Sequence, residues 1–272
     1  MCKSTKDNNE LNNVILGNPK LINSKVYFNG KGNILFCEEN VILKDSVIIF
    51  SGDNSLVFLS ENRSEYKLTI EMFTDCSLYF GKNNYMTNNI KFIVQEHANI
   101  IIGNNNTFST NIKFRTSDAH AIYNIDDKKR INNSGNILIG DHIWVCADVN
   151  IFKNTEIGSG AIIGSNSIAS NKLIDSNTLN VGIPIRKIKD NVCFDPRFVG
   201  NNPFKNNFKY NHELNDYIFN YNEDEILLLD EYKNKLFSSW DLSKKMAFFE
   251  EISKNSSKNR FFRNKDIINN KH

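Results

Sequence analysis

The hydrophobic positions between residues 139 and 185 recur every six residues. The apolar series consists of Ile139, Val145, Ile151, Ile157, Ile163 and Ala169; it lapses at Asp175 and resumes at Val181. The position four residues further on in each hexad is small or apolar throughout, from Ile143 to Ile185. A period of six fits neither a helix of 3.6 residues per turn nor a two-residue strand alternation. It predicts a triangular coil, with one hexad and one inward side chain on each side.

A looser repeat precedes the hexads. Gly81–Phe92 resembles Gly103–Phe114 at a shift of 22 residues. This shift indicates an 18-residue coil with about four extra residues at one corner, and segments such as Asn33–Phe36 and Val47–Phe50 suggest earlier coils. Stacked coils pair through parallel backbone hydrogen bonds about 4.8 Å apart. Asn, which is abundant here, tolerates the left-handed backbone that tight corners need.

The chain changes character near residue 200, where strand-and-turn composition gives way to helical patterns. We expect an N-terminal segment over residues 1–24, a β-helix domain over 25–195 and a helical extension over 196–272. Residues 118–136 are polar and interrupt the hexads, so they should form a loop that leaves the stack of coils. Residues 200–207 read as a linker.

Two helices are predicted in the extension. The first covers Glu223–Phe237, where Ile and Leu alternate with acidic residues and lysines. The second runs from about Trp240 to Ser253, with Ser238 as its N-cap and Asp241 at the third helical position. Because an uncovered last coil exposes unpaired strand edges, the extension is a candidate cap for the open end of the solenoid.

Composition narrows the class of protein. The net charge of +2 over 272 residues gives no reason to expect nucleic acid as a partner. We find no run of 18 apolar residues, so the sequence predicts no transmembrane helix. The polar start lacks the apolar stretch of a secretory signal. The five scattered cysteines indicate reduced thiols in a cytoplasmic protein, without a zinc site. The basic end, Lys254–His272, suits either a disordered tail or contact with an anionic inner-membrane surface.

The hexad run, the interrupting loop with its histidine and the ending Gly182–Lys189 together resemble the hexapeptide-repeat acyltransferases. The resemblance covers about residues 100–190. It is strongest to the branch that contains galactoside, maltose and capsule or lipopolysaccharide O-acetyltransferases. It implies a left-handed parallel β-helix and a homotrimer that binds acetyl-CoA between neighbouring subunits, with no metal. The activity that it implies is transfer of an acetyl group to a saccharide hydroxyl.

His120 matches the catalytic histidine of that family, because it follows Thr116-Ser-Asp-Ala at the start of the loop. A sugar hydroxyl is a poor nucleophile at neutral pH, and an imidazole can remove its proton as it attacks a thioester. Asp118 is a candidate for orienting this imidazole, or it is a solvated loop acid.

Gly140-Asp-His-Ile-Trp-Val-Cys-Ala147 matches a hexad pair of the family. The resemblance places Trp144 in the cleft beside His120 and the pantetheine arm, and it assigns the backbone N–H of Ala147 to the thioester carbonyl. Cys146 replaces the usual Gly, which puts the size of the acyl group in question. His142 is either a second base or an outward-facing polar residue, and the second interpretation is favoured.

The remaining cofactor contacts come from the last coils. The backbone N–H of Ser165 matches a family contact to the pantetheine. Arg186 falls on the first basic position of the terminating segment, with Lys187 and Lys189 beside it, and these cations would attract the phosphates of coenzyme A.

Two other functions stay open from the sequence. One is an N-acetyltransferase acting on an amino sugar nucleotide. The other is a non-catalytic β-solenoid for scaffolding or binding, which gives no reason for a loop with one histidine or for a basic terminator.

Overall fold

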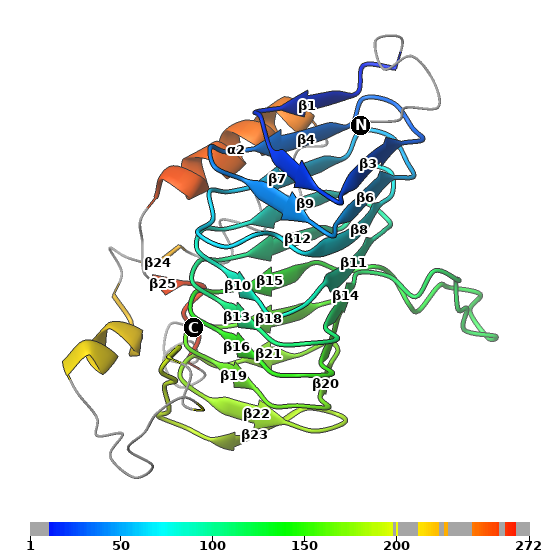
Figure 1. Cartoon of the computed structure of the whole chain (residues 1–272). Helices are drawn as coiled ribbons and strands as arrows, with labels where there is room; N and C mark the ends of the chain where they lie inside the picture. The colour runs from blue at the N-terminus through cyan, green and yellow to red at the C-terminus, as the bar shows by residue number, and fades with distance from the viewer. Residues whose placement is uncertain are drawn as a thin grey trace.

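The computed structural model describes residues 11–197, 200, 212–222, 226–227, 241–255 and 259–264. Most of them form a three-sided stack of short parallel strands (Figure 1). Most coils contribute one strand to each side, as expected from a hexad repeat. This confirms the predicted mainly-β parallel β-helix with a C-terminal helical segment.

The three sides are named face 1, face 2 and face 3 in the order in which each coil visits them. Face 1 comprises β1 (Val14–Leu16), β4 (Ile34–Cys37), β7 (Leu56–Leu59), β9 (Ser77–Phe80), β12 (Asn99–Ile102), β15 (Ile137–Ile139), β18 (Thr155–Ile157) and β21 (Leu173–Ile174). Face 2 comprises β10 (Tyr85–Met86), β13 (Thr107–Phe108), β16 (Trp144–Val145), β19 (Ile162–Ile163), β22 (Leu179–Val181) and β23 (Arg186–Lys189). Face 3 comprises β3 (Lys25–Phe28), β6 (Val47–Phe50), β8 (Leu68–Met72), β11 (Ile90–Val94), β14 (Lys113–Arg115), β17 (Asn150–Phe152) and β20 (Ile168–Ala169). A separate pair, β2 (Lys20–Ile22) and β5 (Ile42–Lys44), occupies the second side of the first coils.

The inside of the stack is the main hydrophobic core. The inward hexad residues from Ile139 to Ala169 are all fully buried, which confirms the period of six. Phenylalanines stack in register between coils, with ring centroids 4.9 Å apart for Phe28 and Phe50 and 4.8 Å apart for Phe92 and Phe114. Burial of these side chains supplies the main driving force for folding.

The hexad register shifts by one residue near the end of the solenoid. Ile157 pairs with Ile174, and Ile163 pairs with Asn180, so these coils contain 17 residues. The inward positions are therefore Ile174 and Asn180, and the expected return of the series at Val181 is wrong. A one-residue deletion keeps an apolar side chain inside where strict spacing would have placed the carboxylate of Asp175.

The earlier coils are longer, as predicted. Leu68 pairs with Ile90, and Tyr85 pairs with Thr107, at the expected shift of 22 residues. Most residues with left-handed backbone at the corners are asparagines. Ile100 then pairs with Ile137, a shift of 37, because the loop after β14 leaves the stack there.

The C-terminal segment covers a side of the solenoid. Helix α2 (Leu242–Lys254) lies along the first strands of face 1 (Figure 1), where Phe249 packs on Phe58 and Tyr79. The described part of the extension therefore covers face 1 and, through Tyr217 and Phe219, the corner between faces 1 and 2, whereas β23 runs antiparallel to β22 at the last coil. The second core includes outward side chains of face 1 that would otherwise be exposed.

Two details of the extension differ from the sequence prediction. Asp241 is the N-cap of α2, because its side chain accepts the backbone N–H of Ser243, and it is not the third helical residue. In the predicted first helix, Ile226–Leu227 form a strand, β24, paired with β25 (Asn259–Arg260). The described residues leave out the rest of that predicted helix, Ser238 and nearly all of the linker over residues 200–207. A short 3₁₀ helix, η2, spans His212–Tyr217. Among the described residues, none of the helices combines the length and apolar character needed to cross a bilayer.

Candidate active site

The loop that carries His120 leaves the solenoid between β14 and β15, at the corner where face 3 turns into face 1. It projects away from the stack beside β14 (Figure 1) and contains an antiparallel bridge between Tyr123 and Arg130. Lys153 occupies the same corner one coil later, and its Nζ lies 2.5 Å from Asp118 Oδ2. A charged pair therefore anchors the root of the loop to the solenoid.

Asn132 connects this pair to the backbone of His120. Its buried side chain donates from Nδ2 to Asp118 Oδ2 at 3.0 Å and to the His120 carbonyl oxygen at 2.8 Å. Asn132 Oδ1 accepts the backbone N–H of Ile122 at 2.7 Å. These bonds hold the backbone around His120, while the histidine itself is exposed. An exposed imidazole on a held backbone is well placed to meet a substrate that docks against the loop.

Asp118 bonds to the loop root rather than to the imidazole. In the part of the chain that the structure describes, its carboxylate bonds to Lys153 and Asn132 and makes no hydrogen bond to the His120 ring. The hydrogen bond from Lys153, aided by that from Asn132, lowers the pKa of the Asp118 carboxyl below its ordinary value. Asp118 is therefore charged at neutral pH, and its connection to His120 runs through Asn132 and the backbone.

Trp144 lies in the middle of face 2 and points outward from β16. Its strand neighbours are Thr107 and Ile162, and the residue is 38% exposed. Its ring centroid lies 5.7 Å from that of Phe194, which comes from the segment after the solenoid. Trp144 thus offers a partly supported aromatic surface on this face.

Two backbone amides on the face-2 side have no partner within the described chain. Neither the N–H of Ala147 nor that of Ser165 donates a hydrogen bond there, although the flanking amides of Cys146 and Gly164 do. Both residues occupy the same corner in successive coils. Unpaired amides at one corner can bind the carbonyl oxygens of a ligand. The half-buried Cys146 lies between Trp144 and this corner, and burial raises the pKa of its thiol.

The basic terminator forms β23 at the end of face 2. Three strand steps, about 14 Å, separate it from Trp144. Arg186, Lys187 and Lys189 are all exposed. Lys187 is already paired, with its Nζ 2.7 Å from Asp190 Oδ1 and 3.7 Å from Asp175 Oδ2, and these carboxylates raise its pKa. Arg186 is therefore the better candidate for an external phosphate.

His142 lies outside the solenoid core, in agreement with its interpretation as an outward-facing residue, but it is buried beneath the C-terminal segment instead of being exposed to solvent. Its ring is stacked with those of Phe194 and Tyr217 at centroid distances of 4.1 and 4.2 Å. His142 Nε2 lies 3.0 Å from the Phe194 carbonyl oxygen. Burial lowers the pKa of the imidazole to about 4, so His142 is neutral near pH 7. It serves the packing of the C-terminal segment.

The site residues of one chain fall on two sides of the solenoid. The loop with His120 starts at the corner between faces 3 and 1, and that corner is opposite face 2 in a three-sided coil. Trp144, the free amides and Arg186 all belong to face 2 or its edge with face 3. One chain therefore does not bring its loop root and its face 2 together.

Comparison with known proteins decides the family. No protein-family model matches the sequence. The crystal structure of the polySia-specific acetyltransferase NeuO superposes with a TM-score of 0.62 at 30% sequence identity, covering 69% of this chain and 86% of NeuO. This chain belongs to the hexapeptide-repeat O-acetyltransferases. The family resemblance found in the sequence is thereby confirmed.

Two further proteins resemble this acetyltransferase. The polysialic acid O-acetyltransferase OatWY has the same fold, with a TM-score of 0.61 at 22% identity over 76% of this chain and 96% of OatWY. WbbJ of Escherichia coli (strain K12), whose name assigns it to lipopolysaccharide biosynthesis as an O-acetyl transferase, is 33% identical over 73 residues. That match covers 27% of this chain and 37% of WbbJ, little more than a third of the curated relative.

Sequence reasoning missed Lys153 and Asn132 in this hexapeptide-repeat acetyltransferase. Lys153 follows the inward Ile151, and only the register across the loop places it beside Thr116 and Asp118. Asn132 lies in a polar loop, where the sequence pattern gives no signal. Phe194 was also missed, because its contacts with His142 and Trp144 join segments that are far apart in the sequence.

Proposed function

We propose that this chain transfers an acetyl group from acetyl-CoA to a hydroxyl of a saccharide, in a bacterial capsule or lipopolysaccharide glycan. The observation that carries the proposal is the 30% identity to a polySia-specific acetyltransferase over 86% of that protein's length. The exposed His120, on a loop held by Asn132, supplies the chemical group that such a transfer requires. OatWY and WbbJ, by their names, also transfer acetyl groups.

His120 acts as the general base in this proposal. Its imidazole takes the proton of the sugar hydroxyl as the oxygen attacks the thioester carbonyl. The backbone N–H of Ala147 stabilises the charge that develops on the carbonyl oxygen. The new C–O bond forms, the C–S bond breaks, and the imidazolium returns its proton to the departing thiolate. Products are an acetyl ester and coenzyme A.

The proposed site is shared between copies of the chain in a homotrimer. His120 and Trp144 lie on opposite sides of one solenoid, so a complete site needs the loop of one subunit against face 2 of its neighbour. The loop carries exposed large hydrophobic residues, among them Ile125 at 81% and Ile131 at 65% exposure. Burial of such side chains against a neighbouring copy would favour assembly.

The co-substrate would lie along face 2 from Trp144 toward the last coil. Ala147 and Ser165 offer free amide donors to the thioester and pantetheine end, and Arg186 offers a cation to the phosphates. Lys187 and Lys189 would add to the local positive charge. These residues fit a coenzyme A arm that starts near the thioester and ends at β23. Because acetyl-CoA is a cytoplasmic metabolite, we place the reaction there. Within the basic end, Arg260 pairs with Asp141 and Arg263 pairs with Glu156, so these two cations hold the chain on the solenoid and only the other basic residues are left to meet an inner-membrane surface.

The test is an acetyl-transfer assay with radiolabelled acetyl-CoA. The acceptor panel contains polysialic acid, other capsular polysaccharides and lipopolysaccharide-derived oligosaccharides. We expect label in at least one saccharide, released by mild alkaline hydroxylamine because the product is an ester. Label resistant to hydroxylamine would indicate an amide and overturn O-acetylation. Absence of transfer to every acceptor, by protein that binds acetyl-CoA, would overturn the saccharide assignment.

A further inference from the structure

Trp144 contacts an aromatic ring that comes from outside the solenoid. On face 2 its neighbours on the adjacent strands are Thr107 and Ile162, neither of which is aromatic. The ring packed against its indole belongs to Phe194, at a centroid distance of 5.7 Å and an interplanar angle of 38°. Phe194 is only 7% exposed, whereas Trp144 is 38% exposed. A buried side chain of the C-terminal segment therefore supports the partly exposed indole.

Phe194 is itself held in two ways by His142. Its ring is stacked on the imidazole, with centroids 4.1 Å apart and planes 8° from parallel. The Nε2–H of His142 donates to the Phe194 carbonyl oxygen at 3.0 Å. The stacking restrains the ring of Phe194, and the hydrogen bond restrains its backbone. Phe194 is thus oriented by a solenoid residue that lies two positions before Trp144 in the sequence.

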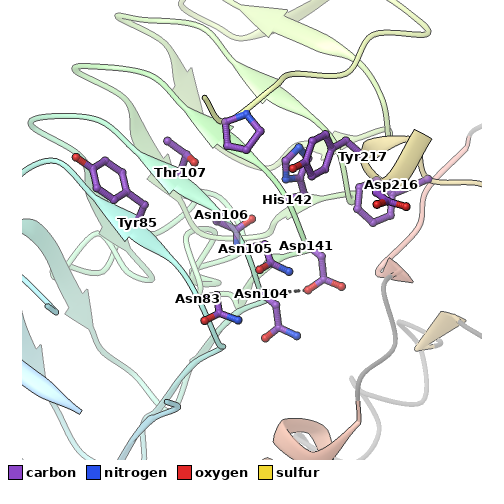
Figure 2. Close-up of a pocket in the computed structure, with 12 residues that line it drawn as sticks. Asn83, Tyr85, Asn104, Asn105, Asn106, Thr107, Asp141, His142, Asp216 and Tyr217 are labelled. Atoms are coloured by element: carbon purple, nitrogen blue, oxygen red, sulfur yellow. Dashed lines mark hydrogen bonds between the residues drawn. The ribbon is translucent and has the colours of Figure 1, made fainter. Parts of the chain in front are cut away.

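Tyr217 covers the other side of the imidazole. The rings of His142 and Tyr217 have centroids 4.2 Å apart and planes 6° from parallel (Figure 2). Two rings cannot both stack on one side of an imidazole at such distances, so His142 lies between Tyr217 and Phe194. The three rings form a sandwich, and Phe194 is the member of it that contacts Trp144.

The two outer rings of the sandwich sit on backbone stretches that are both bonded to Asn177. The N–H of Val192, two residues before Phe194, donates to the Asn177 carbonyl oxygen at 3.0 Å. The N–H of Phe219, two residues after Tyr217, donates to Asn177 Oδ1 at 3.1 Å, and Asn177 Nδ2 donates to the Phe219 carbonyl oxygen at 2.5 Å. Asn177 therefore ties both stretches to the last coils of the solenoid.

The solenoid corner is shaped to accept this part of the chain. His142, Gly160 and Asn177 occupy the same corner position in successive coils, each with left-handed backbone. A Cβ at Gly160 would lie 2.8 Å from Cδ2 of Phe219, too close for a carbon contact. Glycine therefore suits this position twice, because φ is 78° there and because the ring of Phe219 fills the space of a side chain.

We propose that Phe194 is a positioning residue for acetyl transfer: clamped by His142 and Tyr217, it holds the Trp144 indole in the orientation that the reaction uses. The proposal rests on the proposed function, because that function places Trp144 in the acetyl-transfer site. It makes the C-terminal segment a support of the active site as well as a cover of the solenoid. Small displacements of an active-site group lower rates substantially, so loss of this support should lower kcat.

The test follows the Trp144 indole directly. The chain has two tryptophans, so Trp240→Phe leaves Trp144 as the single fluorescent reporter. In this background, Phe194→Leu removes the supporting ring and keeps an apolar side chain. Phe248→Leu is the matched control, because Phe248 is 8% exposed and belongs to the core between α2 and face 1. Time-resolved fluorescence anisotropy measures motion of the indole, and steady-state kinetics with acetyl-CoA and an accepted saccharide measure the rate.

We expect the Trp144 anisotropy to decay faster in Phe194→Leu and to be unchanged in Phe248→Leu. In Phe194→Leu, kcat should fall about 10-fold while the KM for acetyl-CoA changes less than about 2-fold, since the proposed phosphate contacts at β23 are untouched. Tyr217→Leu, which opens the sandwich, should change the anisotropy and kcat in the same direction. Tyr217→Phe, which keeps the ring, should behave like the wild type.

Unchanged anisotropy in Phe194→Leu would overturn the support of Trp144. Faster decay with an unchanged kcat would overturn the positioning role. An equal loss of kcat in Phe248→Leu would attribute the effect to general loosening of the C-terminal segment and would also overturn it. The anisotropy measurement needs no acceptor. Absence of transfer to every saccharide by the wild type would therefore refute the proposed function, while the anisotropy still decides whether Phe194 holds the indole.

Discussion

Lys153 Nζ lies 2.5 Å from Asp118 Oδ2, so a solenoid corner and the root of the His120 loop are joined by a charged hydrogen bond. Asn132 bonds to both Asp118 and the backbone of His120. The contact thus extends from the rigid coil stack to the backbone of the proposed catalytic base. Such supporting contacts matter because small displacements of a catalytic group lower rates substantially.

We predict that Lys153→Met raises the pKa of Asp118 toward its ordinary value. The pKa of Asp118 is lowered in the folded state, so the pair stabilises the loop root at pH values above the ordinary aspartate pKa, which is about 4. This stabilisation is lost as the pH falls through the lowered pKa. Carbon NMR titration of the Asp118 carboxyl measures the shift. We also expect kcat to fall about 10-fold, with the KM for acetyl-CoA unchanged. An unaltered Asp118 titration would contradict the pairing.

His120→Ala should lower kcat by roughly 10²–10⁴-fold while leaving coenzyme A binding nearly intact, because it removes the general base. His97→Ala is the control, since His97 is another exposed histidine, with its ring 3.2 Å from Asp75 Oδ2. Steady-state kinetics with acetyl-CoA and an accepted saccharide measure the effect. Retention of more than about a tenth of the wild-type kcat lies outside the range for general-base removal and would refute the role.

Mixing two inactive variants should restore activity if each site uses two subunits. In trimers formed at random from equal amounts of His120→Ala and Trp144→Ala, about a quarter of the sites should be intact. Each site takes its histidine from one subunit and its tryptophan from the neighbouring subunit, and each of these residues is native in about half of the cases. The mixed trimers are made by unfolding and refolding the two variants together. Each variant unfolded and refolded alone is the control. No recovery in mixed trimers, or a solution mass equal to one chain, would refute the shared site.

Arg186→Ala should raise the KM for acetyl-CoA about 10-fold and leave kcat nearly unchanged. A phosphate contact is equally present in the ground and transition states, so its loss affects binding uniformly. Lys187→Ala should have a smaller effect, because Lys187 already pairs with Asp190 and Asp175. The increase in the KM for acetyl-CoA should be smaller at high salt. A lower kcat at fixed KM in Arg186→Ala would show that the cofactor lies elsewhere.

Burial of His142 should make the free energy of unfolding depend on pH. The unfolded histidine takes up a proton below about pH 6.5. The folded one stays neutral until about pH 4, so stability falls as pH is lowered between these values. The loss should reach up to about 3 kcal/mol. Denaturant unfolding at several pH values, compared with His142→Asn, measures it; Asn tolerates the φ of 51° there. Equal pH slopes in the two proteins would contradict the burial.

Much of the fold was predictable because hexads encode one inward side chain per face. Ile139, Val145 and Ile151 mark three sides of one coil, and the 22-residue repeat marks the longer coils. The shift at Asp175 was not predictable from strict spacing, since a coil can lose one corner residue and keep Ile174 inside. The N-cap of α2 was misplaced because Asp241 and Ser238 are both good caps, and only the packing of the helix on face 1 selects its start.

The sequence by itself determined the solenoid, the loop with His120, the outward Trp144 and the basic terminator, because each follows from local spacing in a repeating coil. Tertiary structure decided which of these groups meet. It placed Lys153 against Asp118, stacked His142 between Phe194 and Tyr217, and set the root of the His120 loop opposite face 2. These contacts join residues that are 35 to 75 positions apart or lie on different faces, and no local pattern encodes such distances. They depend on coil register and on the return path of the C-terminal segment, which only the packed chain defines.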